Sequence, residues 1–329
     1  MEQKFQQNNN DKSGAQPLFS PTPAKASGLT FTLATIFPVL LSFVFITVIT
    51  ALGLTAQEGY DSQDWFLYAS FLLPQISSCL VAFFYFKYTK TSVFQAVRAQ
   101  KCRPRYIFVA LALQIGLLSL SFLNTLFLEF LGGFGYEDTG ISLPNMDGAN
   151  FVFVFIVVAV LPAILEETVF RGFLQNGLRA FGTWGTVLIC GALFSLYHQN
   201  PAQTLYQFCC GAAFALVTLR AGSILPTVIS HFFNNGLILV MTKWGGTVLE
   251  DPFVNLIVMG VSLVCLVGSL VYLLLFDKND AEKLGTLSVT KEEKRSERKY
   301  FLLFAAVGVG ICVLSWLATL AMGMTGVAA

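Results

Sequence analysis

The chain has 329 residues, of which 55% are hydrophobic and only 12% are charged. Soluble domains carry about 25% charged residues, so this composition argues against a soluble globular protein. The net charge of +1 leaves no excess of basic side chains, and we expect no nucleic-acid partner. The sequence therefore predicts a multi-pass membrane protein that has the lipid bilayer as its surroundings.

The first segment, residues 1–28, is polar and rich in Asn, Gln, Ser and Pro. This composition predicts a disordered N-terminus. The apolar run that follows, residues 30–53, is long enough to cross a bilayer, whereas the apolar core of a signal peptide is shorter. We therefore expect residues 30–53 to remain as a membrane anchor.

Further apolar runs follow along the chain, separated by short polar segments. A helix needs about 20 apolar residues to cross about 30 Å of hydrocarbon. The fifth and sixth runs are shorter than this, so the sequence predicts an all-α transmembrane helical bundle with eight or nine spans. The predicted spans are residues 30–53, 66–88, 106–131, 150–176, 184–200, 203–219, 223–242, 253–276 and 300–325.

We expect one helical bundle and no separate soluble domain. The bundle covers residues 29–276, and the polar motifs described below lie within about residues 148–242. A charged cytoplasmic linker, residues 277–299, joins it to a C-terminal transmembrane helix in residues 300–329.

Basic residues are unevenly distributed among the loops. Residues 87–105 contain six basic residues and no acidic one, whereas residues 54–65 and 132–150 contain acidic residues and no basic one. Basic loops favour the cytoplasmic side of a cell membrane. The sequence therefore predicts a cell-membrane protein with a cytoplasmic N-terminus and an external C-terminus.

Charged side chains are rare inside the predicted spans, where each is costly to bury. Three of them lie together, at Glu166, Glu167 and Arg171. On a helix, Glu167 and Arg171 are four residues apart and can form an ion pair. Glu166 points about 100° away and has no such partner, which makes it a candidate general acid or base.

The two histidines of the chain also lie in apolar surroundings. His198 follows Phe194 by four residues, and Asn235 follows His231 by four residues, so that each pair shares one helix face. A single buried histidine is usually structural. Two histidines in polar clusters, together with a buried glutamate pair, favour a catalytic site instead.

The positions of the glycines and prolines bear on whether these clusters meet. Glu166 lies 16 residues before Gly182, and His198 lies 16 residues after it. A hairpin at Gly182 would therefore bring both side chains to the same depth, which His231 matches less well. Pro162 leaves a backbone carbonyl of its helix without its usual donor, and a membrane tolerates this only where protein or water provides a partner.

Together, the three clusters resemble the signature of the CAAX-protease and bacteriocin-processing (CPBP, or Abi) family of intramembrane proteases. That family includes the endopeptidase that trims prenylated proteins. The resemblance covers about residues 148–242. In the order of the three motifs, the matching residues are Glu166, Glu167 and Arg171; Phe194 and His198; and His231 and Asn235.

The resemblance implies an intramembrane endopeptidase that hydrolyses a peptide bond of a membrane-associated protein or peptide. In this reading Glu166 and His198 hold and deprotonate a water molecule. His231 and Asn235 stabilise the oxyanion of the tetrahedral intermediate. The supporting, structural residues are Glu167, Arg171 and Phe194.

Two histidines and a glutamate can also form a zinc site. The ligands would then be Glu166, His198 and His231, which would occupy both the proposed base and an oxyanion donor. A metal-free site uses each residue once, and we favour it, with a divalent metal such as zinc as the alternative.

Two other classes of protein fit part of the pattern. Buried charges and broken helices also occur in transporters, although no inverted repeat is evident here. A membrane scaffold that binds a partner without proteolysis is the second alternative, and the complete motifs argue against it. The sequence identifies neither the substrate nor the oligomeric state.

Overall fold

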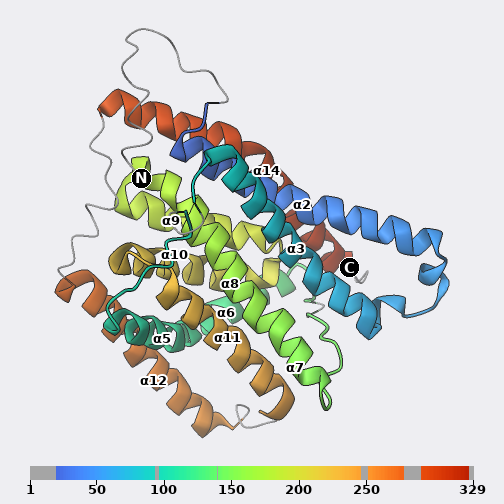
Figure 1. Ribbon diagram of the computed structural model, residues 1–329. Helices are drawn as coiled ribbons and strands as arrows, with labels where there is room; N and C mark the ends of the chain where they lie inside the picture. The colour runs from blue at the N-terminus through green and yellow to red at the C-terminus, as the bar shows by residue number, and fades with distance from the viewer. Residues whose placement is uncertain (1–19, 93–95, 139, 246–250, 278–289, 326–329) are drawn as a thin grey trace.

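The computed structural model describes residues 20–92, 96–138, 140–245, 251–277 and 290–325 (Figure 1). Within these residues, all regular elements are helical. Eight helical segments are long and apolar enough to cross a membrane. The predicted all-α bundle of eight or nine spans is confirmed.

Single helices form several of the spans, and others are built from two or more consecutive helices. In chain order, the α-helices are α2 (Pro23–Ala51), α3 (Asp64–Thr89), α5 (Arg105–Leu117), α6 (Ser121–Gly132), α7 (Asn150–Phe155), α8 (Leu161–Glu167), α9 (Gly182–Tyr197), α10 (Thr204–Ala221), α11 (Leu225–Trp244), α12 (Pro252–Val271) and α14 (Lys291–Thr325). Shorter 3₁₀ segments are Leu54–Ala56, Tyr60–Ser62, Leu118–Leu120, Gln175–Phe181 and Pro201–Gln203, and π-helical segments are Ile156–Val160, Thr168–Leu174 and Tyr272–Phe276.

The predicted hairpin lies in the helical segment that begins with α7. Its first arm runs from Asn150 through α8 to Phe181, and its second arm is α9. The turn between them is at Gly182, which adopts a φ of 76° that favours glycine. Across this turn, the Thr186 hydroxyl donates to the carbonyl of Leu178 at 2.9 Å. Because the chain folds back here, residues 150–197 form a hairpin rather than one long straight span.

Two helices begin earlier than the predicted spans. Helix α2 begins at Pro23, where the Thr22 side chain accepts a hydrogen bond from the backbone of the first turn, so the polar N-terminus ends before residue 28. Helix α14 begins at Lys291, inside the predicted linker, and Thr290 and Glu293 cap it reciprocally. Both helices extend beyond their apolar runs because polar caps stabilise the added turns. Residues 1–19 and 278–289 lie outside the described part of the chain.

Loops that the sequence places on one side of the membrane lie together in the structure. On the predicted cytoplasmic side, the Gln100 amide donates to the carbonyl of Gly222 at 2.6 Å, and Arg105 forms an ion pair with Asp277 at 3.1 Å. On the predicted external side, the backbone N–H of Asn145 donates to Asp64 at 2.7 Å. The grouping agrees with spans of alternating direction, and which face is cytoplasmic stays a prediction.

Helices α9 and α10 pack closely through glycine. A Cβ atom on Gly191 of α9 would lie 2.8 Å from the carbonyl oxygen of Phe208, and one on Gly211 of α10 would lie 2.8 Å from Cβ of Phe194. Small residues allow two membrane helices to approach this closely. The contact fixes the position of Phe194, the first residue of the second motif.

Candidate active site

Helices α9 and α10 form a second hairpin, the α9–α10 hairpin, whose tip lies inside the bundle. Helix α9 has 16 residues and is therefore about 24 Å long, shorter than the hydrocarbon layer. Near the tip, Trp316 of α14 donates to the hydroxyl of Thr204 at 2.8 Å. Gly323 lies seven residues, or about 10 Å, further along α14, and its carbonyl accepts from Glu137 of the loop after α6. The short fifth and sixth spans thus place the tip of the α9–α10 hairpin deeper in the bundle than the loop after α6.

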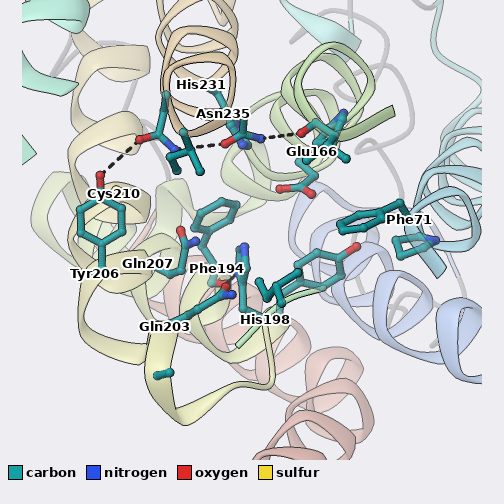
Figure 2. Close-up of a pocket in the computed structure, with 18 of the residues that line it drawn as sticks. Phe71, Glu166, Phe194, His198, Gln203, Tyr206, Gln207, Cys210, His231 and Asn235 are labelled. Atoms are coloured by element: carbon teal, nitrogen blue, oxygen red, sulfur yellow. Dashed lines mark hydrogen bonds between the residues drawn. The ribbon is translucent and has the colours of Figure 1, made fainter. Parts of the chain in front are cut away.

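The space beyond this tip is a cavity of about 960 Å³. Glu166 of α8, His198 at the end of α9, and His231 and Asn235 of α11 all line it (Figure 2). In Figure 2 the carboxylate of Glu166 points into the cavity between His198 on one side and His231 with Asn235 on the other. The four residues that the sequence singles out for catalysis therefore face one cavity, although they come from three separate parts of the chain.

Glu167 points away from the cavity, into the protein. Its side chain is fully buried, and one carboxylate oxygen, Oε1, lies 3.2 Å from Nη1 of Arg171. The same oxygen lies 3.0 Å from Nδ1 of His231. The Glu167–Arg171 ion pair agrees with the sequence-based prediction, whereas the contact with His231 was not expected. Glu167 thus connects the buried ion pair to a residue of the cavity.

Aromatic rings surround the buried guanidinium of Arg171, whose side chain is only 1% exposed. Its Cζ atom lies 4.5 Å from the ring centroid of Phe194 and 5.4 Å from that of Phe214. Such cation–π contacts help a cation to remain buried. The ring of Phe194 also lies edge-on to His198, at 4.8 Å between centroids. Phe194 therefore separates the Arg171 side of the site from His198.

The hydrogen bonds of the two histidines determine which nitrogen of each ring carries the proton and which can act in the cavity. Nδ1 of His198 lies 2.8 Å from the carbonyl oxygen of Phe194. Because a carbonyl only accepts, Nδ1 carries the proton, and in the neutral ring Nε2 is an acceptor. Nδ1 of His231 likewise donates to the Glu167 carboxylate. His231 can therefore donate from Nε2 only when its ring is protonated.

Asn235 provides the partner that Pro162 makes necessary. Proline has no N–H to donate to the carbonyl four residues earlier, that of Val158. The Asn235 side-chain amide donates to this carbonyl at 3.1 Å. Asn235 is thus bound to the α8 segment through a hydrogen bond and has one further amide hydrogen for another acceptor.

This pairing predicts a dependence between Asn235 and Pro162. Asn235→Ala should destabilise the protein by about 1–3 kcal/mol, because it removes the donor of the part-buried hydrogen bond to the Val158 carbonyl. In a Pro162→Ala background the loss should be smaller, since the alanine N–H can serve that carbonyl. The measurement is a double-mutant cycle of unfolding free energies in detergent. Equal losses in both backgrounds would contradict the pairing.

A second set of polar side chains supports Asn235. Asn234 donates from its amide to the Asn235 side-chain oxygen at 3.1 Å. The Asn234 oxygen accepts from the amide of Gln114 at 2.7 Å and from the hydroxyl of Tyr206 at 3.3 Å. Sequence reasoning missed these residues. The available signal was that polar side chains stand in otherwise apolar runs, one of them next to a motif residue.

The proposed zinc ligands do not form a metal cluster. Among the described residues, no three His, Cys, Asp or Glu side chains are grouped closely enough to hold a metal ion. Glu166, His198 and His231 are not such a group in the described part of the chain. Glu167, the carboxylate next to Glu166 in sequence, is already engaged by Arg171 and His231.

Comparison with known proteins agrees with the three motifs. Residues 148–237 match the family model described as type II CAAX prenyl endopeptidase Rce1-like, and all three motifs lie within the match. The predicted resemblance to the CAAX-protease family is thereby confirmed for this part of the chain. The match covers about a quarter of the residues. No curated protein and no solved structure matches the chain. Together with its eight apolar helical segments, the match identifies a multi-pass membrane protein with a segment similar to a protease family.

Proposed function

We propose that the chain is an intramembrane endopeptidase that hydrolyses a peptide bond of a membrane-associated protein or peptide. The observation that carries the proposal is that Glu166 and the free Nε2 of His198 face one cavity at the depth of the hairpin tip. Both groups can accept a hydrogen bond from a molecule in the cavity.

These two acceptors are suited to bind one water molecule. A water that donates one hydrogen to Glu166 and the other to His198 presents its lone pairs to a substrate carbonyl. As the water attacks, Glu166 takes its proton as general base and can later give it to the leaving amine. This sequence of steps forms the new carboxyl group and breaks the C–N bond without a change in oxidation state.

On the opposite side, the oxyanion of the tetrahedral intermediate would accept hydrogen bonds from His231 and from the remaining amide hydrogen of Asn235. This role requires a protonated His231. Glu167 would then stabilise the imidazolium and fix the orientation of its ring.

A membrane scaffold or transporter-like protein without proteolysis is the alternative. The two readings differ in cells. If the chain is a protease, its removal should cause one or more uncut membrane proteins to accumulate, and wild-type chain, but not Glu166→Gln chain, should restore the cut form. Quantitative mass spectrometry of the membrane fraction measures this. An unchanged set of protein termini would favour the alternative.

We also propose that the site works without a metal, because the candidate ligands do not form a cluster. Activity of the purified protein should then survive prolonged chelation, and elemental analysis should find less than one equivalent of zinc. Stoichiometric zinc, together with activity that is lost on chelation and restored by zinc, would falsify the metal-free proposal.

For the orientation, we propose a cell membrane in which the N-terminus and the basic loops are cytoplasmic and the C-terminus is external. In a cysteine-free background, an impermeant thiol reagent added to intact cells should label Glu58→Cys and Asp138→Cys. It should not label Lys101→Cys until the cells are opened. All three positions are exposed in the structure. Labelling of Lys101→Cys in intact cells would overturn this orientation.

A further inference from the structure

Asn235 is reached by a chain of hydrogen bonds that begins on another helix. Gln114 of α5 donates from its amide nitrogen to the Asn234 side-chain oxygen at 2.7 Å, and the Tyr206 hydroxyl donates to the same oxygen at 3.3 Å. Asn234 in turn donates to the Asn235 side-chain oxygen at 3.1 Å. The bonds can be followed from Tyr206 to Asn235 in Figure 2. Gln114, Tyr206 and Asn234 form what we call the polar chain.

Every bond to Asn235 and Asn234 has a fixed direction, and the carbonyl of Val158 sets it. A backbone carbonyl only accepts, so the Asn235 group that meets it at 3.1 Å is the NH₂ group. The Asn235 oxygen then faces Asn234 and accepts from its NH₂ group. The Asn234 oxygen needs donors for the same reason and has two, Gln114 and Tyr206. Reversal of either asparagine amide would set two acceptors or two donors against each other.

This direction matters where an oxyanion would form. An Asn235 oxygen that faced the cavity would repel a developing negative charge, and it would compete for the Nε2 proton of a protonated His231. The bond from Asn234 occupies that oxygen and leaves the second amide hydrogen of Asn235 as a donor. Hydrogen bonds in a chain also polarise one another, so donation to Asn234 strengthens Asn234 as a donor in turn.

The polar chain is built into the packed contact between α5 and α11, where Gln114 is only 2% exposed. One turn away along both helices, the hydroxyl of the fully buried Ser230 donates to the carbonyl of Ala110 at 3.0 Å. The two bonds therefore join the same pair of helices, at positions four residues apart on each. The bond from Gln114 leads on to Asn235, whereas the bond from Ser230 ends at the backbone of α5.

We propose that Gln114, Tyr206 and Asn234 are positioning residues for the hydrolysis. They act through Asn235, whose amide they hold with an N–H toward the oxyanion and the oxygen away from it. The inference rests on the proposed function and adds to it three residues that lie outside the three sequence motifs.

A double-mutant cycle on turnover tests this role. Asn234→Leu removes the donor to Asn235 at similar side-chain size. It should lower kcat about tenfold with little change in KM, because the oxyanion exists in the transition state and not in the bound substrate. Asn235→Ala should lower kcat by about 100-fold or more. Since Asn234 acts through Asn235, Asn234→Leu should have almost no further effect in the Asn235→Ala background.

Three results would overturn the proposal: an unchanged kcat for Asn234→Leu, a higher KM in place of a lower kcat, or a second loss of about tenfold in the Asn235→Ala background. Gln114→Leu should behave as Asn234→Leu does. Ser230→Ala is the matched control, because it breaks the neighbouring bond between α5 and α11. It should lower the melting temperature, and any factor by which it changes kcat should be the same in the wild-type and Asn235→Ala backgrounds.

Unfolding free energies of the same variants provide a measurement that needs no cleavage. Asn234→Leu and Asn235→Ala remove the same hydrogen bond, so the double variant should lose less stability than the sum of the single losses. Additive losses would overturn the positioning role even in an active protease. Coupled losses in a protein that shows no Glu166-dependent cleavage would refute the proposed protease function alone.

Discussion

Glu166→Gln is expected to reduce turnover by at least about 100-fold while the protein remains folded in the membrane. The glutamine side chain keeps the size and much of the hydrogen-bonding capacity of glutamate, but it cannot accept a proton from water at neutral pH. Because Glu166 faces the cavity and makes no ion pair in the described structure, its replacement should leave the packing of α8 intact.

The measurement is cleavage of an identified membrane substrate by purified protein in vesicles. His198→Ala should give a similar loss, since it removes the second acceptor for the water. Glu129→Gln is the matched control, because Glu129 is an exposed glutamate of α6 that does not line the cavity. Full activity of Glu166→Gln would show that the mechanism as described is wrong.

Loss of either partner of the buried ion pair should have the largest effect on stability. Glu167→Ala leaves Arg171 buried without its counter-charge, and Arg171→Ala leaves Glu167 buried with His231 as its remaining partner. Removal of one partner from such a pair costs about 3–5 kcal/mol. Both side chains are essentially unexposed, so water cannot solvate the charge that remains. We expect a lower melting temperature and a lower folded yield for both variants.

Two comparisons separate this structural role from a catalytic one. Glu167→Gln combined with Arg171→Met removes both charges and should recover part of the stability that either single change loses. Asp147→Ala removes a partner of Lys243 that is 88% exposed and should leave the melting temperature nearly unchanged. If Glu167→Ala and Arg171→Ala were fully folded but inactive, the pair would belong to the chemistry instead.

Much of the site could be predicted because it depends on spacing along helices. The equal distances of Glu166 and His198 from Gly182 suffice to bring both to one depth once the chain turns at that glycine. The ion pair of Glu167 and Arg171 is likewise local, between residues four positions apart. The spans could be predicted from hydrophobicity, and the short fifth and sixth runs correspond to a real hairpin that ends within the bundle.

The contact between Glu167 and His231 could not be predicted in this way. It joins residues 64 positions apart, and it depends on how α8 and α11 rotate about their axes. The π-helical segments on both sides of α8 alter that rotation, and hydrophobic periodicity does not indicate where such segments occur.

Isotope incorporation tests directly whether Glu166 activates a water molecule for hydrolysis. Purified protein in vesicles is given its substrate in water enriched in the heavy oxygen isotope, and the fragments are weighed by mass spectrometry. We expect the wild-type protein to yield a fragment with heavy oxygen in its new carboxyl group, and Glu166→Gln to yield almost none. Labelled product formed equally well by Glu166→Gln, or fragments that carry no heavy oxygen, would contradict water activation by Glu166.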